Sequence, residues 1–578
     1  MQRTFWAMHG QRWRIVYQLM VILLLLGAGK AGPVLAQDKP TGELRIALAF
    51  LGAQRLIPWN EDPSGGVKQY QLLIYDHLVG CTEDGQLSSE NGIAQSWEES
   101  ADKLSWTFHL RPNIQFHDGT ALTADDVKFS IDSFLDPKSI GLLSTGRAAY
   151  QGVEVQNPST VVIHLNQPVI FLPWNFSCAT LSDGMILPSK YFQQVGADAF
   201  AKKPIGSGPY RVVKNSAGSL IQLEAVERHW RDGVPKFKTV TFLLVPEEST
   251  RLAQLRTGEA DIIAVSREKV PEIKAAGFNV FSKLNDQVIV VYMQQQWEAV
   301  PVRDKRVRQA LNLALDKDAI MQFVFAGQGV PVPMYPIGSY GVAGGADATL
   351  QPYPYDPQKA RQLLAEAGYP NGFETKIYSF VTADLPEFPR LTEAVADYLG
   401  KVGVKAKIVS MDRAAISIKR QARTLPGELL PWSTPNRSVA SQIVTLINAL
   451  HHSASQFTST MVPELDQMIE RALTATDVHE VERLVGEMHR FLYDNAHNIT
   501  IGEIHTNYAA NKKVMAWNLG RNLYDNNLHI PPDFVVRGIP AHRKPPEVRI
   551  WRLRNQSAVG TRPPSTSTPH WPAWMARR

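Results

Sequence analysis

The sequence predicts an α/β protein built from more than one folded unit. The chain has 578 residues, which is too long for one small domain. Its composition, with 44% hydrophobic and 20% charged residues, is typical of a folded globular protein. Segments of strand character alternate with amphipathic helical segments, which is the pattern of an α/β architecture.

The strand candidates are short, and their apolar residues alternate enough to be half buried. They are 42–50, 103–110, 160–165, 372–380 and 404–411. The helical candidates are amphipathic, and two of them end in Gly, as helices commonly do. They are 301–325, 356–368, 389–403, 463–475 and 477–496.

The N-terminus reads as a secretory signal peptide. Arg3, Arg12 and Arg14 precede an apolar run over 15–29, and small residues follow up to Ala36. A basic flank, a short apolar core and a small-residue exit are typical of such a peptide. The alternative, a membrane anchor, needs about 20 apolar residues, more than this run holds. We expect residues 1–36 to be removed and the mature protein to be periplasmic.

Charge is distributed unevenly along the chain. The formal net charge is +5, but the two ends of the chain are basic. Residues 1–36 carry four basic residues and no acidic ones, and residues 537–578 carry nine basic residues and one acidic residue. The body between them is therefore mildly acidic, which gives no reason to expect a nucleic-acid partner. The segment 537–578 is basic and rich in Pro, and we expect a disordered tail. A membrane-surface or partner contact is the alternative.

The sequence shows no metal or cofactor motif, and no cofactor is expected. Its two cysteines, Cys81 and Cys178, have no partner ligands at zinc spacing. An exported protein meets an oxidising compartment, so these cysteines can pair, but the sequence does not give their distance. The adjacent His451 and His452 would point to different sides of a helix or a strand, which makes them a poor metal pair.

A His beside an Asp, at 117–118, raises the question of catalysis. The residues around them favour scaffold instead: Gly119 suits a tight turn, and Thr123 with Asp126 has the spacing of a capping box. An amphipathic helix over 126–135 follows. We therefore expect a turn and a helix start here, without chemistry.

The same stretch, within "WTFHLRPNIQFHDGTALTADDVKFSID" at 106–132, resembles a signature of the extracellular solute-binding proteins of the oligopeptide and dipeptide ABC-importer family. Further segments resemble that family in the same order. They are "PIGSGPYRVV" at 204–213, "STRLAQLRTGEADII" at 249–263, "VRDKRVRQALNLALDKDAI" at 302–320 and "YDPQKARQLLAEAGYPNGF" at 355–373. Together these matches span most of residues 42–520.

The resemblance implies a two-lobed periplasmic-binding-protein fold with mixed sheets flanked by helices and a ligand cleft between the lobes, which close by hinge motion. The expected boundaries follow the family's pattern. Lobe I is expected from 37–75, 190–267 and 509–536, the inserted subdomain from 76–189, and lobe II from 268–508.

An enzyme is not expected. The sequence has no nucleophile elbow, zinc-protease motif or P-loop. The glycines of 205–211 suggest a phosphate loop, but Pro209 removes a backbone donor there and the spacing fits no phosphate motif, so a turn is the better reading.

The ligand site is expected at four residues. Peptide-binding relatives carry a Trp-x-x-Asp segment whose Asp pairs with the peptide amine. Trp432 matches it here, but Pro435 stands at the Asp position. Trp432 is a candidate cleft wall, and Arg437 is a candidate for an anionic ligand group. Trp59 is a candidate because it follows the first strand, where the resemblance implies that the chain turns toward the cleft, and Tyr378 because it lies at the end of a second-lobe strand.

The resemblance implies a monomeric receptor that binds a peptide or another small organic solute and delivers it to ABC permease subunits. The alternative is a sensing or chaperone-like binding module on the same fold, with the basic tail as its partner contact.

Overall fold

The computed structural model describes residues 39–61, 66–82, 87–178, 183–231, 234–335, 347, 349–382, 385–435, 440–512 and 514. The expected signal peptide and the tail 537–578 lie outside the described residues, as does Arg437.

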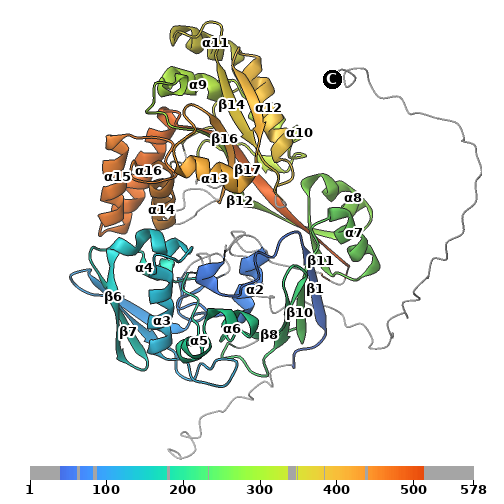
Figure 1. The fold of residues 1–578 in the computed structure, drawn as a ribbon, viewed down its shortest axis with the longest axis vertical. Coiled ribbons are helices and arrows are strands. Elements are labelled where there is room, and N and C mark those ends of the chain that lie inside the picture. Colours follow the sequence, from blue (N-terminus) through green and yellow to red (C-terminus); the bar gives the residue numbers. More distant parts are fainter. Residues whose placement is uncertain are drawn as a thin grey trace, which may run out of the picture. The chain divides into compact units, whose positions relative to one another are not determined.

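Helices and strands alternate along the chain as the sequence predicts (Figure 1). The strands are β1 (Glu43–Leu48), β2 (Gly80–Cys81), β3 (Leu87–Ser88), β4 (Ala94–Glu99), β5 (Ser105–Leu110), β6 (Tyr150–Asn157), β7 (Thr160–Leu165), β8 (Tyr210–Ser216), β9 (Leu220–Ala225), β10 (Thr239–Leu244), β11 (Ile262–Val265), β12 (Asn279–Met293), β13 (Gly329–Val330), β14 (Glu374–Ser379), β15 (Lys405–Ser410), β16 (Leu429–Pro435) and β17 (Asn498–Ala510).

The helices include short 3-10 turns, written η. They are η1 (Pro58–Asn60), α2 (Gly66–Ile74), α3 (Ala124–Leu135), η2 (Leu142–Ala149), α4 (Leu172–Asn175), α5 (Ser189–Val195), α6 (Ala197–Lys202), α7 (Glu248–Thr257), η3 (Arg267–Lys269), α8 (Val270–Ala275), η4 (Pro301–Arg303), α9 (Lys305–Leu313), α10 (Lys317–Phe323), α11 (Pro357–Glu366), α12 (Phe388–Gly400), α13 (Arg413–Gln421), α14 (Ala440–His451), α15 (Pro463–Thr474) and α16 (Val478–Asp494).

The single helical segment predicted over 301–325 is broken. It forms η4, α9 and α10, and the break falls at Ala314–Asp316. Asp316 begins α10 by accepting a hydrogen bond from the backbone N of Ala319 at 2.9 Å. A cap of this kind satisfies a free helix N–H group and favours a new start over a continuous helix.

One large sheet runs through both lobes, which are defined below by their hydrophobic cores. Its path is β15-β14-β16-β12-β17-β11-β1-β10-β9-β8, and β13 also pairs with β17. The long strands β12 and β17 pair over 279–283 and again over 287–292, with a register shift between Lys283 and Gln287. The second part of β12 also pairs with β16. Two strands therefore connect the two halves of the sheet.

Two large hydrophobic cores define what we call the first and the second lobe. The first core contains Leu44, Phe108 and Phe242, and a smaller cluster formed with α7 and α8 covers another part of that lobe's sheet. A four-stranded sheet, β4-β5-β7-β6, belongs to the first core. The second core contains Val290 and Leu391. The residue boundaries expected from the sequence stay predictions.

The His–Asp stretch is scaffold, as its turn residues predict. His117 Nδ1 accepts from the backbone N of Gly206 at 3.2 Å, so Nε2 carries the proton and donates to the O of Gly208 at 2.9 Å. Burial lowers the pKa of His117 to about 4, which keeps the ring neutral. A Cβ atom at Gly206 would collide with the backbone of Ile74, so the glycines of 205–211 serve a close backbone approach.

The predicted helix start is also present. The backbone N of Thr123 donates to Asp126 Oδ2 at 2.9 Å, and Asp126 lies in the first turn of α3. Asp126 Oδ1 accepts from both the backbone N and the hydroxyl of Ser189, at 2.8 and 2.7 Å. The same carboxylate therefore caps α3 and fixes the start of α5.

Cys81 and Cys178 form a disulfide, which decides the question that the sequence left open. Their Cα atoms are 5.7 Å apart and their sequence separation is 97. Next to the disulfide, Val79 and Ser177 form a parallel β-bridge. The bond closes a long loop that contains the four-stranded sheet.

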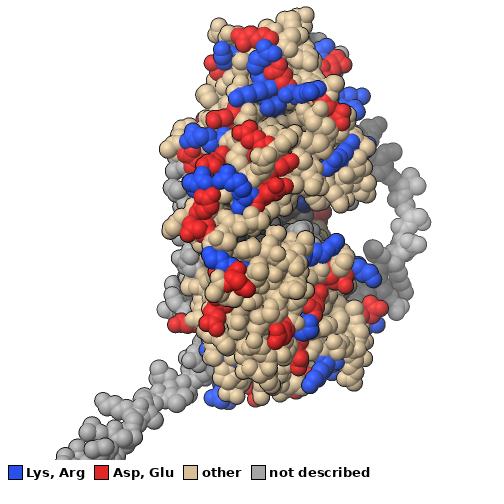
Figure 2. Space-filling model, turned by 90° about the vertical axis from the view of Figure 1, so that its left-hand side faces the viewer, with Lys and Arg blue, Asp and Glu red and all other residues tan. Residues whose placement is uncertain are grey.

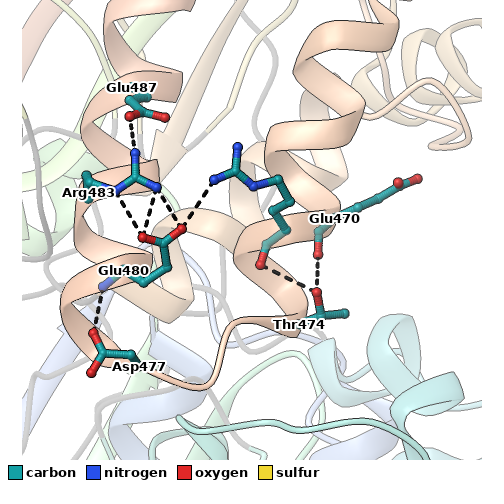
Figure 3. A network of polar contacts seen from close by, with 7 residues as sticks. Glu470, Thr474, Asp477, Glu480, Arg483 and Glu487 are labelled. Atoms are coloured by element: carbon teal, nitrogen blue, oxygen red, sulfur yellow. Dashed lines mark hydrogen bonds and ion pairs between the residues drawn. The ribbon is translucent and has the colours of Figure 1, made fainter.

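Charged residues of both signs lie side by side over the upper half of the face in Figure 2. Figure 3 shows a group of charged side chains on α15 and α16, in which Arg483 contacts both Glu480 and Glu487. Arg471 pairs with the same Glu480. Exposed pairs of this kind contribute little individually to stability. In the loop between these helices, the O of Thr476 accepts from Lys103 Nζ of the first lobe.

Candidate functional site

The candidate site lies where three strands of the second lobe end. β14 is parallel to both β15 and β16, with Ile377 opposite both Ile408 and Leu429. The carboxyl ends of parallel strands meet at one edge of a sheet, and ligands in open α/β sheets bind in the crevice outside that edge. The residues that follow β14 and β15 are therefore brought beside β16 by the topology.

Aromatic rings line this edge. The rings of Phe380, just after β14, and Trp432, on β16, have centroids 5.3 Å apart, and Phe388 of α12 stacks on Phe380 at 4.6 Å. Phe380 and Phe388 are buried, and Trp432 is half-buried. Trp432 therefore keeps part of its ring accessible while its neighbours hold it in place.

Arg413, which begins α13 after β15, covers the Trp432 ring. Its Cζ lies 4.7 Å from the ring centroid of Trp432 and 6.0 Å from that of Phe380. A guanidinium group over an aromatic face is attracted by the ring's quadrupole, and the two planes can stack. One basic side chain and two aromatic rings thus come from three neighbouring strands: Phe380 and Arg413 follow β14 and β15, and Trp432 lies within β16.

A buried polar network fixes β16 behind this edge. The hydroxyl groups of Tyr292 and Thr434 are 2.9 Å apart, and Arg420 lies over the Tyr292 ring with its Cζ 4.5 Å from the centroid. Tyr335 contacts His451 Nε2 at 2.6 Å. Hydrogen bonds between buried side chains restrict the backbone that carries them. Trp432, two residues before Thr434, lies on the strand that the Tyr292–Thr434 bond holds in place.

Three of the sequence-predicted residues are described, and they lie in different surroundings. Trp59 is 6% exposed and packs edge-on against Phe129 and Phe134, with ring centroids 5.8 and 5.5 Å away. Trp432 lies at the edge described above. These surroundings favour a core role for Trp59 and a surface role for Trp432. Neither side chain is shown touching a ligand.

Tyr378 is 3% exposed, and its hydroxyl donates to Glu428 Oε2 at 2.8 Å. Burial, together with Glu428, raises the pKa of this tyrosine. Glu428 Oε1 also accepts from Lys376 Nζ at 2.7 Å. Tyr378 therefore has a partner within the protein, toward the amino end of β16.

A groove of about 760 Å³ opens at that opposite, amino end of the strands. The residues that begin β14 and β15 line it, together with Pro426, Gly427 and Glu428 before β16. Two of its three lysines are paired with acids, Lys376 with Glu428 and Lys405 with Glu374. The groove lies at the amino ends of these strands, whereas ligands in open α/β sheets bind outside the carboxyl ends.

Sequence reasoning missed Phe380 and Arg413. Phe380 is the last residue of the strand predicted at 372–380, and Arg413 follows the strand predicted at 404–411, so the rule about carboxyl ends would have pointed to them. That rule needs the strands to be parallel neighbours, which the sequence alone does not show.

Within the described ranges, no helix has the length and apolar character needed to cross a bilayer. The same part of the chain holds no group of three or more His, Cys, Asp or Glu side chains placed to bind a metal ion.

The chain is similar to several known proteins. The sequence profile of the middle part of the bacterial extracellular solute-binding proteins, family 5, matches residues 89–446. The chain belongs to this family. The match confirms the resemblance carried by the motifs at 106–132 and beyond.

The relatives include binding proteins for different solutes. Heme-binding protein A of Haemophilus influenzae is 30% identical over 462 residues, 73% of this chain and 80% of the relative. Glutathione-binding protein GsiB of Pectobacterium atrosepticum is 28% identical over 71% of this chain and 79% of the relative. The fold is also similar to the structure of MoaA from A. tumefaciens R10 in complex with mannopinic acid, with a TM-score of 0.68 and 26% sequence identity. That match covers 82% of this chain and 95% of the MoaA chain.

The family 5 chain therefore has the predicted two-lobed α/β fold of the periplasmic binding proteins. It is a substrate-binding receptor of the ABC-transporter type and belongs to a family of transport-associated binding proteins that act in the periplasm or outside the cell.

Proposed function

We propose that this receptor captures a peptide or a peptide-sized organic solute at the carboxyl ends of β14, β15 and β16, and that the two lobes close over it. The observation that carries the proposal is the half-buried Trp432, held by Phe380 and covered by Arg413 at that edge. Apolar walls with a few directed polar groups are typical of small-molecule sites.

Closure needs a connection that bends. β12 and β17 are the long strands shared by both lobes, and their register shifts between Lys283 and Gln287. A few residues that absorb a backbone change can serve as a hinge. The ligand drives closure only through tighter binding to the closed form. The closed receptor then delivers its solute to ABC permease subunits.

The expected export fits this role. We propose that the signal peptide is cleaved after Ala36, that the mature receptor is a periplasmic monomer, and that the lobes have the boundaries given by the family's pattern. The relatives bind heme, glutathione and mannopinic acid by their names, so membership in the family does not fix the solute. A peptide-sized organic solute covers this range.

Native mass spectrometry tests the site. The full chain is expressed with its own leader, and the exported protein is purified from the periplasm without refolding. We expect the wild type to carry a small organic passenger and Trp432→Ala to lose it. Lys376→Gln, which changes the groove at the amino end of the same strands, serves as the control and should keep it. A passenger that survives Trp432→Ala but is lost in Lys376→Gln would move the site to the groove.

A further inference from the structure

We propose that β15, at one edge of the large sheet, is a docking surface for an extended, acidic segment of a partner protein, which pairs with it as an additional strand. This surface belongs to the second lobe and is separate from the carboxyl ends of the strands, so it does not depend on the receptor's solute. Three features carry the proposal: an unpaired strand edge, an unbalanced row of lysines, and the groove beside them.

One edge of β15 has no partner strand in the described part of the chain. β15 is the terminal strand of the sheet and pairs with β14 over its six residues, without a register shift. Folded proteins commonly protect such edges with a bulge or cover them with another segment. β8, at the other end of the same sheet, has a register shift between Val212 and Lys214. The edge of β15 is regular and therefore suited to pair with another strand.

Every second residue of β15 turns its backbone groups toward this edge. Parallel strands bond through alternate residues. The backbone N of Lys405 donates to the O of Phe373, so the residues in step with Lys405 bond toward β14. Ala406, Ile408 and Ser410 therefore present their N–H and C=O groups outward, and Ile408 is 38% exposed. When a strand is added to a sheet, hydrogen bonds to such main-chain groups provide the affinity.

The lysines beside this edge carry more charge than the neighbouring acids balance. Lys405 and Lys407 lie two residues apart, so their side chains share one face of β15. The register places Lys407 directly opposite Lys376 of β14, and like charges in such positions are destabilising. Lys376 and Lys405 each pair with an acid, at 2.7 and 3.5 Å. Lys407 has no such partner among the described residues.

An acidic strand would remove this imbalance. Side chains of neighbouring strands that share a face of the sheet lie close enough to interact. Acidic residues at alternate positions of an added strand would therefore stand beside Lys405 and Lys407. A second copy of β15 would instead bring the same lysines against each other. The charge thus favours an acidic partner over another copy of this chain.

The groove of about 760 Å³ extends this surface at the amino end of the strand. Lys405, Ala406 and Lys407 form part of its wall, so the groove borders the open edge. In strand addition, pockets for alternate side chains provide the specificity. Apolar residues from other segments supply such a pocket here: Val300, Pro301, Phe373, Val404 and Pro426.

Fluorescence anisotropy with two labelled peptides tests the inference. Both peptides are N-acetylated and C-amidated; one alternates Thr with Glu, and the other alternates Thr with Gln. The full receptor is used as purified from the periplasm, with its passenger. We expect it to bind the glutamate peptide about 2- to 30-fold more tightly than the glutamine peptide, the range that two cross-strand charge pairs provide.

Ile408→Pro should weaken binding of both peptides by about fivefold, because proline removes one outward N–H donor and leaves the bonds to β14 in place. Ile408→Thr keeps that donor and is the matched control. The double variant Lys405→Gln/Lys407→Gln should bring the ratio of the two affinities close to one. Lys128→Gln/Lys359→Gln, on α3 and α11, removes the same charge elsewhere and should leave the ratio unchanged.

Each outcome decides the inference. Equal affinities for the two peptides, binding of neither, or a preference that survives the Lys405/Lys407 double variant overturns it. Binding that is lost in Trp432→Ala but kept in Ile408→Pro assigns the peptides to the cleft and also overturns it. A wild-type dimer that Ile408→Pro abolishes, detected by native mass spectrometry, assigns the edge to a second copy of the chain instead. The lysine variants leave the backbone unchanged, so they decide the question even if Ile408→Pro does not fold.

Discussion

Arg267 and Glu387 form a buried ion pair between the two lobes, with Arg267 Nη1 3.0 Å from Oε1 and 3.1 Å from Oε2. Arg267 lies in η3, beside α8 of the first lobe, and Glu387 precedes α12 of the second. The O of Arg267 also accepts from Gln328 Nε2 at 2.8 Å, and the O of Gln328 accepts from the backbone N of His505 on β17. The pair therefore anchors both lobes next to a strand that connects them.

Glu387→Gln should lower the free energy of unfolding by about 3–5 kcal/mol, because it leaves the Arg267 charge buried and unpaired. Urea unfolding at pH 7 measures the loss. Glu268→Gln is the control, because Glu268 forms an exposed ion pair with Arg390. This variant should lower the free energy of unfolding by about 1 kcal/mol or less. Equal losses in the two variants would contradict a special role for the buried pair.

Trp59→Ala should destabilise the receptor by about 3–5 kcal/mol without changing its affinity for its solute. Trp59 is buried among Phe129, Phe134 and Phe192, and its removal leaves a cavity in the first core. Thermal unfolding and binding are measured on the same sample. If affinity fell while stability held, Trp59 would belong to the ligand site after all.

Two buried histidines should make the receptor less stable as the pH falls below about 6.5. Burial lowers the pKa of His489 to about 3, and burial with the nearby charge of Arg420 lowers that of His451 to about 3. As the pH falls, the unfolded chain takes up protons first. Each histidine therefore removes about 1.4 kcal/mol of stability per pH unit between its unfolded and folded pKa values.

His489→Leu isolates one of these contributions. Neither ring nitrogen of His489 has a hydrogen-bond partner among the described residues, so leucine removes a titrating group without breaking a bond. The free energy of unfolding, measured with urea between pH 6 and pH 4.5, should fall less steeply with decreasing pH in this variant than in the wild type, by about 1.4 kcal/mol per pH unit. The exposed His479 provides the control, and His479→Gln should keep the wild-type slope. An unchanged slope in His489→Leu would contradict a neutral buried ring.

Pro435→Asp should create a preference for peptides with a free amine. The new carboxylate would stand where peptide-binding relatives are expected to hold theirs, and a charge-assisted bond of this type should add about tenfold in affinity. Calorimetry compares tripeptides with their N-acetylated forms. The wild type should show little difference between them, and a strong preference for the free amine in the wild type would mean that another acid takes the missing role.

The sequence predicted the scaffold better than the site, for physical reasons. Strand and helix periodicity, the Thr123–Asp126 cap and the turn at Gly119 depend on neighbours in sequence, and the structure confirms them. Trp59 and Trp432 look alike by that measure, since each is a tryptophan near a strand. What separates them is the packing of distant residues, three aromatic rings around Trp59, and Phe380 with the guanidinium group of Arg413 beside Trp432. Arg413 gave no local signal at all, because its position matters only once β14, β15 and β16 are parallel neighbours.

Hydrogen–deuterium exchange of the full receptor, with its passenger and after the passenger has been stripped, tests the central claim most directly. We expect the passenger to slow exchange in segments 377–382, 409–416 and 430–435, at the carboxyl ends of β14, β15 and β16, and in the hinge parts of β12 and β17. Protection confined to 373–376 and 404–407, at the amino ends of β14 and β15, would contradict the account and place the ligand in the groove instead.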